Sequence, residues 1–463
     1  MISRKLLILI LPLWGLLSCG NSNNHNSEEI LNLESQEEIS RDQYFRVKAP
    51  KECDISSQNR FVYDVMHDSY LWANQVKKVD YLDSNYTSPD LLLHDLKVEK
   101  DHFSFIIQEE EATRYFEEGE NDNFGFSIKL VALDSINYGL IVSFIYPNSP
   151  ADQAGFKRGD LIRSINQQNI TQENIQKIAQ LLEEERQISF GVADIDTGII
   201  LKEVTLTKET YPIQTILYSN IDEQLLADKK IGYMVFQDFI DSAIPEIDQL
   251  FSQFKTAGVN ELILDLRYNG GGSVDVARHL SSLIGGDHVW NNVFHHVNLN
   301  ERYSKYNFTS YFEAYDTNAL NLSRVFILTT RASCSASELV INALRASINN
   351  IEVIQIGEAT CGKPYGFIGA GLFCDKALYA INMETKNSDN VGDYVDGIFP
   401  KCQAKDNILK DFGDPKEDLL SAARFYLKED RCPQVNTQTK QQPSREIQDL
   451  PTSSPFKRLM VAF

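Results

Sequence analysis

The chain has 463 residues, of which 43% are hydrophobic and 24% are charged. This length predicts roughly two to four domains, and the composition is that of a folded protein. The net charge of −21 argues against nucleic-acid binding through a general basic surface, because such binding depends on neutralising phosphates. After the first twenty residues no stretch is long and apolar enough to span a bilayer, so a multispan membrane protein is also disfavoured.

The first residues have the pattern of an export signal. Arg4 and Lys5 precede an apolar run, Leu6–Leu17, which is too short to cross a membrane but suits a secretory signal. The run ends in LLSCG, which resembles a bacterial lipobox. We therefore expect residues 1–18 to be a lipoprotein signal peptide and Cys19 to carry the lipid. A plain signal peptide with an incidental cysteine is the alternative.

An Asn/Ser-rich stretch follows the lipobox. Residues 19–44 begin CGNSNNHNSEE, and the Asn/Ser-rich composition after Cys19 cannot build a core and indicates a flexible tether. A lipid on Cys19 would anchor a soluble body to a membrane of the bacterial cell envelope, in the periplasm or at the cell surface. Residues 45–112 then mix aromatic and charged residues near helical spacing, which predicts a small helical N-terminal region without chemistry of its own.

Residues 113–209 change to short strands separated by glycines. The sequence NFGF followed by SPADQAGFKRGD resembles a PDZ domain of the kind attached to bacterial proteases. Such a domain binds a peptide as an added strand and holds its terminal carboxylate in a nest of backbone N–H groups. The resemblance assigns carboxylate binding to Phe124, Gly125 and Phe126. A small β domain that only packs against the rest of the chain is the alternative.

Residues 210–432 alternate strands and helices, as expected of an α/β layer. Three strand ends carry unusual sequences, namely DLRYNGGG, TTRASCSASE and GEATCGK. The last two belong to one strand–helix–strand unit, whose strands should be parallel, so that both loops leave the same edge of the sheet. Open α/β sheets bind their ligands at that edge.

Two residues at this edge could form a nucleophile and its base. Ser335 begins a predicted helix, and Lys363 can deprotonate it if desolvation lowers the lysine pKa toward neutrality. The N–H groups of Ala336 and Gly271 could then bind the developing oxyanion. A non-catalytic role is the alternative at each position. Ser335 could serve solely as the helix cap in a capping box with Glu338, and Lys363 could be a solvated loop lysine.

Taken together, the three motifs behind a PDZ-like domain resemble the tail-specific or C-terminal processing serine proteases. The resemblance covers roughly residues 60–430 and implies an α/β fold with a crotonase/ClpP-like core and a Ser335–Lys363 dyad. It also implies the oxyanion donors Ala336 and Gly271. One departure is Phe367, which stands four residues after the lysine where many members carry a Gln or Glu that orients it. The third catalytic residue therefore stays unassigned.

Six cysteines remain after Cys19, and they allow fifteen disulfide pairings. Their spacings are not those of a zinc site, and we expect no metal or cofactor. If the two catalytic loops meet, Cys334 and Cys361 are close enough to pair, and Cys374 with Cys402 is a weaker expectation. Unpaired, Cys334 would be an alternative nucleophile.

The sequence thus predicts a membrane-anchored serine endopeptidase that recognises protein or peptide substrates through free, apolar C-termini. A catalytically inactive PDZ lipoprotein that binds protein tails is the alternative, and the oligomeric state stays open. Residues 433–463 are polar and are expected to be disordered. The closing segment Leu459–Phe463 is apolar, and we expect it either to occupy the PDZ groove or to pack on the body.

Overall fold

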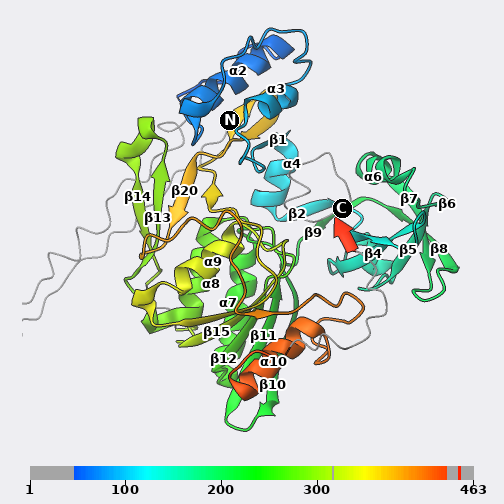
Figure 1. Cartoon of the computed structure of the whole chain (residues 1–463), viewed down its shortest axis with the longest axis vertical. Coiled ribbons are helices and arrows are strands. Elements are labelled where there is room, and N and C mark those ends of the chain that lie inside the picture. The colour runs from blue at the N-terminus through cyan, green and yellow to red at the C-terminus, as the bar shows by residue number, and fades with distance from the viewer. Residues whose placement is uncertain (1–45, 315–316, 435–446, 450–463) are drawn as a thin grey trace, which may run out of the picture. The chain divides into compact units, whose positions relative to one another are not determined.

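The computed structural model describes residues 46–314, 317–434 and 447–449 (Figure 1). The expected signal peptide, Cys19, the tether and the closing segment Leu459–Phe463 lie outside these residues. Within the described ranges, no helix combines the length and apolar character needed to cross a membrane.

A six-stranded sheet forms the centre of the α/β region. Its strands, in spatial order, are β10 (Ile216–Leu226), β11 (Lys229–Phe236), β12 (Glu261–Asp265), β15 (Arg324–Thr329), β16 (Glu352–Gly357) and β21 (Cys402–Gln403). Only β10 runs antiparallel to its neighbour. The parallel strands are apolar on both faces, which is typical of a sheet covered by helices on both sides.

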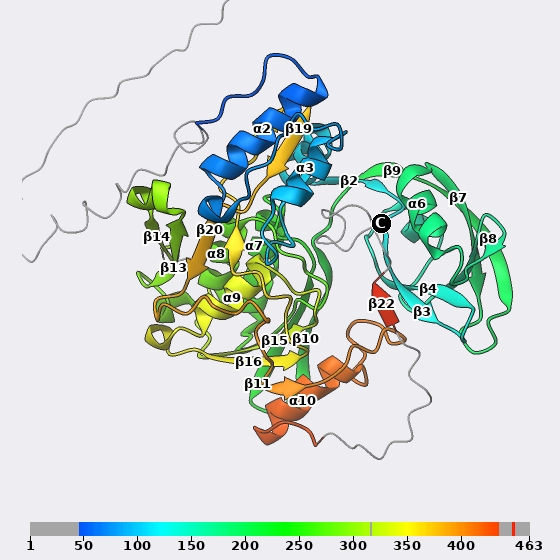
Figure 2. The same cartoon turned by 45° about the horizontal axis from the view of Figure 1, so that its top comes forward.

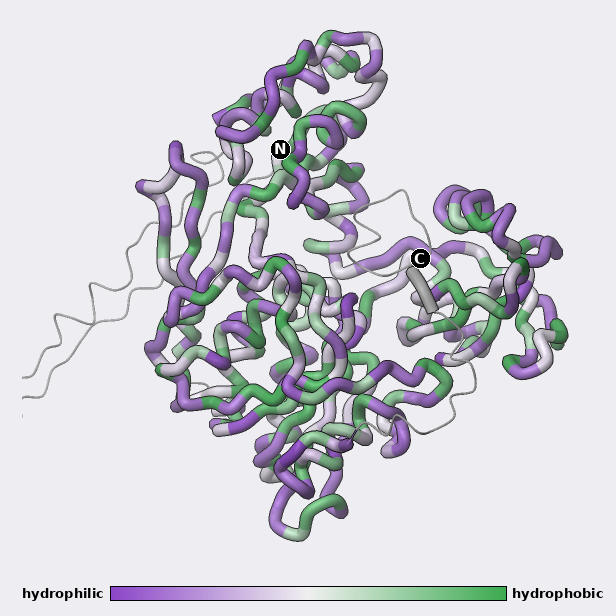
Figure 3. The backbone as a smooth tube through the Cα atoms, in the orientation of Figure 1, coloured by the Kyte–Doolittle hydropathy of each residue, from purple (hydrophilic) through white to green (hydrophobic). Residues whose placement is uncertain are grey.

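Successive residues of β15 show how both faces are covered. Val325 and Ile327 pack in one core with helices α7 (Ala243–Ala257), α8 (Val274–Gly285) and α9 (Ala336–Leu344). Phe326 and Leu328 point to the opposite face, where α10 (Asp418–Glu429) supplies the partners. Hydrophobic segments accordingly gather within the sheets, whereas the outer loops are largely hydrophilic (Figure 3). The α/β core predicted from the sequence is therefore correct.

The PDZ region has a sheet and a core of its own (Figure 2). Five of the seven strands in this sheet are β3 (Phe126–Ala132), β4 (Tyr138–Ile145), β5 (Leu161–Ile165), β7 (Gln187–Ala193) and β8 (Ile200–Thr207). Helix α6 (Ile175–Glu184) packs Ile178, Ala179 and Leu182 into that core. This arrangement is the β domain that the glycine-punctuated sequence predicts.

The N-terminal region is helical but also contributes an edge strand to a separate three-stranded sheet. Asp54 caps the N-terminus of helix α2 (Ile55–Asp68), because its carboxylate accepts a hydrogen bond from the Ser57 N–H at 3.1 Å. Helix α3 (Pro89–Leu96) follows, and strand β1 (Phe105–Gln108) then pairs with β19 (Lys376–Tyr379). A region close to the N-terminus therefore pairs with one that follows Ser335 and Lys363 in the chain.

Three disulfides are present among the described residues, namely Cys53–Cys374, Cys334–Cys361 and Cys402–Cys432. The pairing of Cys334 with Cys361 is confirmed. The expected Cys374–Cys402 pair is wrong, because pairing of β1 with β19 brings Cys374 to the N-terminal region. Cys402 in the edge strand β21 instead meets Cys432, which follows α10.

Candidate active site

Two adjacent parallel strands deliver the candidate nucleophile and base to one edge of the sheet. Strands β15 and β16 pair in register until Thr329 lies beside Gly357. The turn after β15 carries Ser335, and the loop after β16 carries Lys363. The Cys361 N–H donates to the Ser333 carbonyl at 3.0 Å, so the two segments touch through their backbones.

Ser335 adopts a backbone conformation that residues with a side chain rarely accept. It is the residue before α9 and has φ +56° and ψ −109°. Such strain costs on the order of 1–3 kcal/mol and persists where the surroundings enforce it, often at functional sites. The side chain is partly exposed, whereas its neighbours Cys334 and Ala336 are buried. The turn therefore presents Ser335 on a constrained backbone.

The glycine loop lies directly against this serine. A Cβ atom on Gly271, which has φ +107°, would lie 2.7 Å from the Ser335 Cβ and 3.0 Å from the Ala336 nitrogen. A Cβ on Gly272 would collide with the Phe239 carbonyl at 2.1 Å. Both positions thus require glycine, for the close backbone approach as well as for the positive φ.

The predicted oxyanion donors differ in their hydrogen bonding. The Gly271 N–H donates to the Asn269 Oδ1 at 2.9 Å, so it is engaged in this structure. Ala336 is the first residue of α9, a position whose N–H has no partner within the helix. The role of Gly271 as a donor stays a prediction and requires that its bond to Asn269 be released.

Asn269 also ties the glycine loop to the nucleophile turn. Its carbonyl accepts hydrogen bonds from the Cys334 N–H and the Ser337 hydroxyl, both at 3.0 Å. Its side-chain amide donates to the Phe236 carbonyl at 3.0 Å, which holds the loop against β11. The asparagine of the motif DLRYNGGG thus fixes the distance between glycines and serine.

The arginine of the same motif is fully buried and balanced by carboxylates. Arg267 forms ion pairs with Asp265, Asp406 and Glu417 at 2.6–2.9 Å. Asp406 also binds Arg158 of the PDZ region at 2.7 Å. A continuous polar network therefore runs from the PDZ region to the strand end that carries the glycine loop.

Glu338 joins the nucleophile turn to the lysine loop. Its buried carboxylate accepts hydrogen bonds from the N–H groups of Ser335 (2.9 Å), Gly362 (2.8 Å) and Lys363 (2.8 Å). The Thr360 hydroxyl adds a fourth bond at 2.6 Å. Burial raises the pKa of this carboxyl, while the four donors act in the opposite direction. The capping-box spacing predicted the bond from the Ser335 N–H, but no sequence signal indicated the three bonds from the lysine loop.

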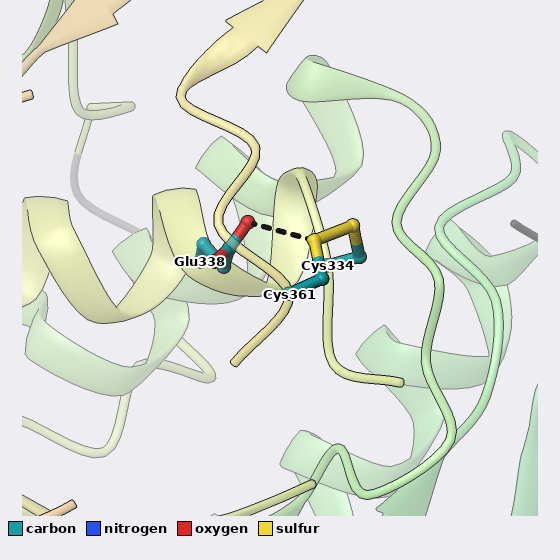
Figure 4. Close-up of side chains that lie close together, drawn as sticks. All are labelled: Cys334, Glu338 and Cys361. Carbon is teal, nitrogen blue, oxygen red and sulfur yellow. Dashed lines mark hydrogen bonds between the residues drawn. A yellow bond between two sulfur atoms is a disulfide. The ribbon is translucent and has the colours of Figure 1, made fainter. Parts of the chain in front are cut away.

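The disulfide Cys334–Cys361 is a second link between the two loops, with a Cα–Cα distance of 5.2 Å. Figure 4 shows it beside Glu338, whose Oε2 lies 3.4 Å from the Cys361 sulfur. These three side chains come close enough to suggest a metal site. Both sulfurs are consumed by the disulfide, so they offer no thiolate ligand, and Cys334 in this form cannot act as a nucleophile.

Lys363 is buried, with 5% of its surface exposed, and its ammonium lies among aromatic rings. The Nζ atom is 4.5 Å from the Phe367 ring centroid and 5.3 Å from that of Phe103. Burial lowers its pKa to about 8, opposed by the negative charges of Asp101 and Glu338. Among the described residues no hydrogen bond joins this ammonium to Ser335. Catalytic hydrogen bonds are often long without substrate.

The N-terminal region therefore contributes to this site, contrary to the expectation that it carries no chemistry. Phe103 belongs to it, and so does Asp101, which is 3% exposed. The Asp101 carboxylate accepts bonds from the Tyr70 hydroxyl at 2.7 Å and from the Phe103 N–H at 2.9 Å. Sequence reasoning missed these residues because more than 250 positions separate them from Lys363.

The predicted carboxylate loop is built from backbone. The Phe124 and Phe126 side chains are fully buried in the PDZ core, so only their backbone groups are available to a ligand. Gly125 has φ +89°, and a Cβ there would lie 2.0 Å from that of Ser149. The shape of the loop thus depends on glycine, the Gly125 N–H donates to the Asn123 Oδ1 at 2.8 Å, and carboxylate binding by the loop stays a prediction.

Known proteins share this organisation. Residues 230–370 match the profile of peptidase family S41, residues 57–105 that of the peptidase S41 N-terminal domain, and residues 141–193 that of the PDZ domain. The matched N-terminal and peptidase regions are those of peptidase family S41. The glycine loop, Ser335 and Lys363 all fall within the S41 match.

Among the relatives is carboxyl-terminal-processing peptidase 2 of Arabidopsis thaliana chloroplasts, 28% identical over 59% of this chain and 52% of that protein. Carboxy-terminal processing protease CtpA of Bacillus subtilis is 26% identical over 48% of this chain and 44% of its own length. The chain thus spans about half the length of the curated relatives it matches. The crystal structure of a putative S41 protease from Bacteroides fragilis superposes with a TM-score of 0.66 at 24% identity, covering 80% of this chain and 97% of that one.

Replacing Glu338 with glutamine should destabilise the protein. One oxygen becomes an NH₂ group that faces N–H donors, which leaves buried groups without partners at a cost of about 3 kcal/mol. The free energy of unfolding from denaturant titration measures this loss. Glu358→Gln changes an exposed carboxylate of the same loop and should alter it by less than about 0.5 kcal/mol. Equal stabilities of the two variants would contradict the role of Glu338.

Proposed function

We propose that this chain is a serine endopeptidase in which Ser335 is the nucleophile and Lys363 the general base. The observation that carries the proposal is the buried lysine, whose loop is fixed to the strained serine turn by Glu338 and by a disulfide. At pH 7 a lysine with a pKa of about 8 is neutral in about one molecule in ten. An ordinary lysine is neutral in fewer than about one in a thousand.

The proposed reaction forms an acyl-enzyme. Neutral Lys363 takes the hydroxyl proton while the Ser335 Oγ attacks the peptide carbonyl, and the resulting ammonium gives that proton to the leaving amine. The Ala336 N–H, with the glycine loop, stabilises the oxyanion. Lys363 then deprotonates the water that releases the acyl group, which restores the free serine.

The proposed substrates are protein chains with free, apolar C-termini. The PDZ region supplies the carboxylate loop, and its capture of a tail raises the concentration of that chain near the catalytic edge. The matched relatives are named for carboxyl-terminal processing, which supports this substrate class.

A lipid on Cys19 would hold this peptidase at a membrane of the bacterial cell envelope. The support is the basic start, the apolar run and the lipobox-like LLSCG of the sequence. Such an anchor would place the catalytic body outside the cytoplasm, where disulfides form and persist. The three disulfides of the structure fit that location.

Ser335→Ala and Lys363→Ala should each abolish proteolysis of an unfolded substrate while the fold is retained. Lys363→Arg should fail as well, because a guanidinium stays protonated and cannot accept a proton. Labelling with a serine-directed fluorophosphonate should be lost in Ser335→Ala. Undiminished cleavage by folded Ser335→Ala protein would refute the dyad. Tail binding without any labelling of the wild type would favour the inactive PDZ lipoprotein.

Phe367→Gln should shift the pH dependence of catalysis. The base acts in its neutral form, so kcat/KM rises with pH through the lysine pKa of about 8. A polar group in place of the ring favours the ammonium, raises that pKa, and should move the rising limb upward by about one pH unit. Phe399→Gln, at an exposed phenylalanine, should leave the limb in place. An unmoved limb in Phe367→Gln would show that the ring does not tune Lys363.

Amidation of a substrate's C-terminus should slow its cleavage, since it removes the charge that the loop's N–H groups recognise. The measurement compares initial rates for one unfolded substrate with a free and with an amidated terminus. Digestion of the same pair by an unrelated endopeptidase provides the control. Equal rates for the two forms on this protein would show that the PDZ region does not recognise carboxylates.

Cys19→Ser should release the protein from the membrane. In a bacterial host, the wild type should incorporate a labelled fatty acid and sediment with membranes. The variant should do neither, because it lacks the thiol that carries the lipid. Label on the Cys19→Ser protein would contradict the assignment.

A further inference from the structure

A short strand from the C-terminal part of the chain pairs with the PDZ sheet. Strand β22 (Ile447–Asp449) runs antiparallel to β3, with Ile447 opposite Val131 and Asp449 opposite Lys129. It is the outermost strand of that sheet, beside β3 (Figure 2). Strand β4 pairs with the other side of β3. Of the described strands, only β22 pairs with this side.

This side of β3 is the edge at which a PDZ domain binds peptides. β3 begins at the carboxylate loop, since Phe126 is both the last residue of NFGF and the first of the strand. Its inward side chains Phe126, Ile128 and Leu130 share one core with Ile178 and Leu182 of α6. A peptide that extends the sheet here forms main-chain hydrogen bonds with β3, which is the way PDZ ligands bind.

The direction of β22 is also that of a bound C-terminal peptide. Asp449 lies opposite a residue of β3 closer to the carboxylate loop than the partner of Ile447, so the chain runs toward the loop. Fourteen residues follow Asp449 in the sequence, and the segment therefore pairs as an internal strand. It uses the main-chain part of the site without presenting a terminal carboxylate at Asp449.

We infer that residues 447–449 are a resident ligand of the PDZ edge and compete with substrate tails for it. The inference rests on the proposed function for its consequence, but not for the pairing itself. Twelve residues join this strand to Gln434, so the competitor is covalently attached and its occupancy does not depend on protein concentration. A substrate must displace it, and a free C-terminal carboxylate that engages the loop gives the substrate an advantage that the resident strand lacks.

Hydrogen exchange tests the pairing without proteolysis. All proteins carry Ser335→Ala, which prevents self-cleavage in the proposed mechanism. Gln448→Pro/Asp449→Pro changes two successive residues, so at least one proline removes an N–H that faces β3. Thr437→Pro/Gln438→Pro, in the connecting segment, is the matched control. We expect exchange of the 129–131 amides to rise about tenfold in the first variant and to be unchanged in the second.

Adding a peptide of residues 445–451 to the first variant should restore this protection, and the same peptide with the two prolines should not. Unchanged exchange of the β3 amides in Gln448→Pro/Asp449→Pro would overturn the inference.

Kinetics with proteins that retain Ser335 test the competition. Gln448→Pro/Asp449→Pro should lower KM for an unfolded substrate with a free C-terminus by about tenfold, with kcat unchanged, because it removes a competitor and leaves the catalytic loops intact. An unchanged KM would refute competition. A protein without activity toward any substrate would refute the proposed function, while the exchange experiment would still decide the pairing.

Discussion

The buried carboxylate of Glu338 forms the interactions on which the arrangement of the Ser335 and Lys363 loops depends. One side chain accepts hydrogen bonds from the backbone of both loops, at Ser335 and at Gly362 and Lys363. A carboxylate without partners would be costly at this depth, and so would the N–H groups that it satisfies. The nucleophile turn and the lysine loop are therefore fixed relative to each other, and the disulfide Cys334–Cys361 adds a covalent link at the same place.

The pKa of the lysine is determined by residues from two parts of the chain. Two rings, Phe103 and Phe367, surround its ammonium and keep water away, which lowers its pKa. An orienting polar residue would hold the lysine by a hydrogen bond, whereas here aromatic contact and burial hold it. Asp101 supplies an opposing charge that limits the shift. The pKa of Lys363 is thus set jointly by the N-terminal region and the loop that follows β16.

The PDZ region is connected to the catalytic edge by buried polar groups. Arg158 and Arg267 share the Asp406 carboxylate, and Arg267 precedes the glycine loop by only a few residues. The Tyr146 hydroxyl, at the end of β4, donates to Asp238 next to Phe239, whose carbonyl limits Gly272 to glycine. Buried networks of this kind are stable only when every member is satisfied. A displacement of the PDZ region would break these bonds and affect the loop that faces Ser335.

Local sequence determined much of this protein. Apolar strands followed by Gly- and Ser-rich turns predicted the α/β layer. The spacing of β15, α9 and β16 predicted that Ser335 and Lys363 leave the same edge, because a crossover of that length makes the strands parallel. Their proximity also indicated the Cys334–Cys361 pair. These inferences succeeded because each depends on residues fewer than about thirty positions apart or on backbone rules that hold for any sequence.

Tertiary structure alone decided the rest. No local pattern placed Phe103 against Lys363, paired Cys53 with Cys374, or laid residues 447–449 along β3. The sequence indicated Glu338 only as a capping residue, whereas in the fold its carboxylate also binds the backbone of the lysine loop. Contacts of this kind join segments that are distant in the chain, and their energies come from desolvation and shared donors that exist only once the segments are packed together.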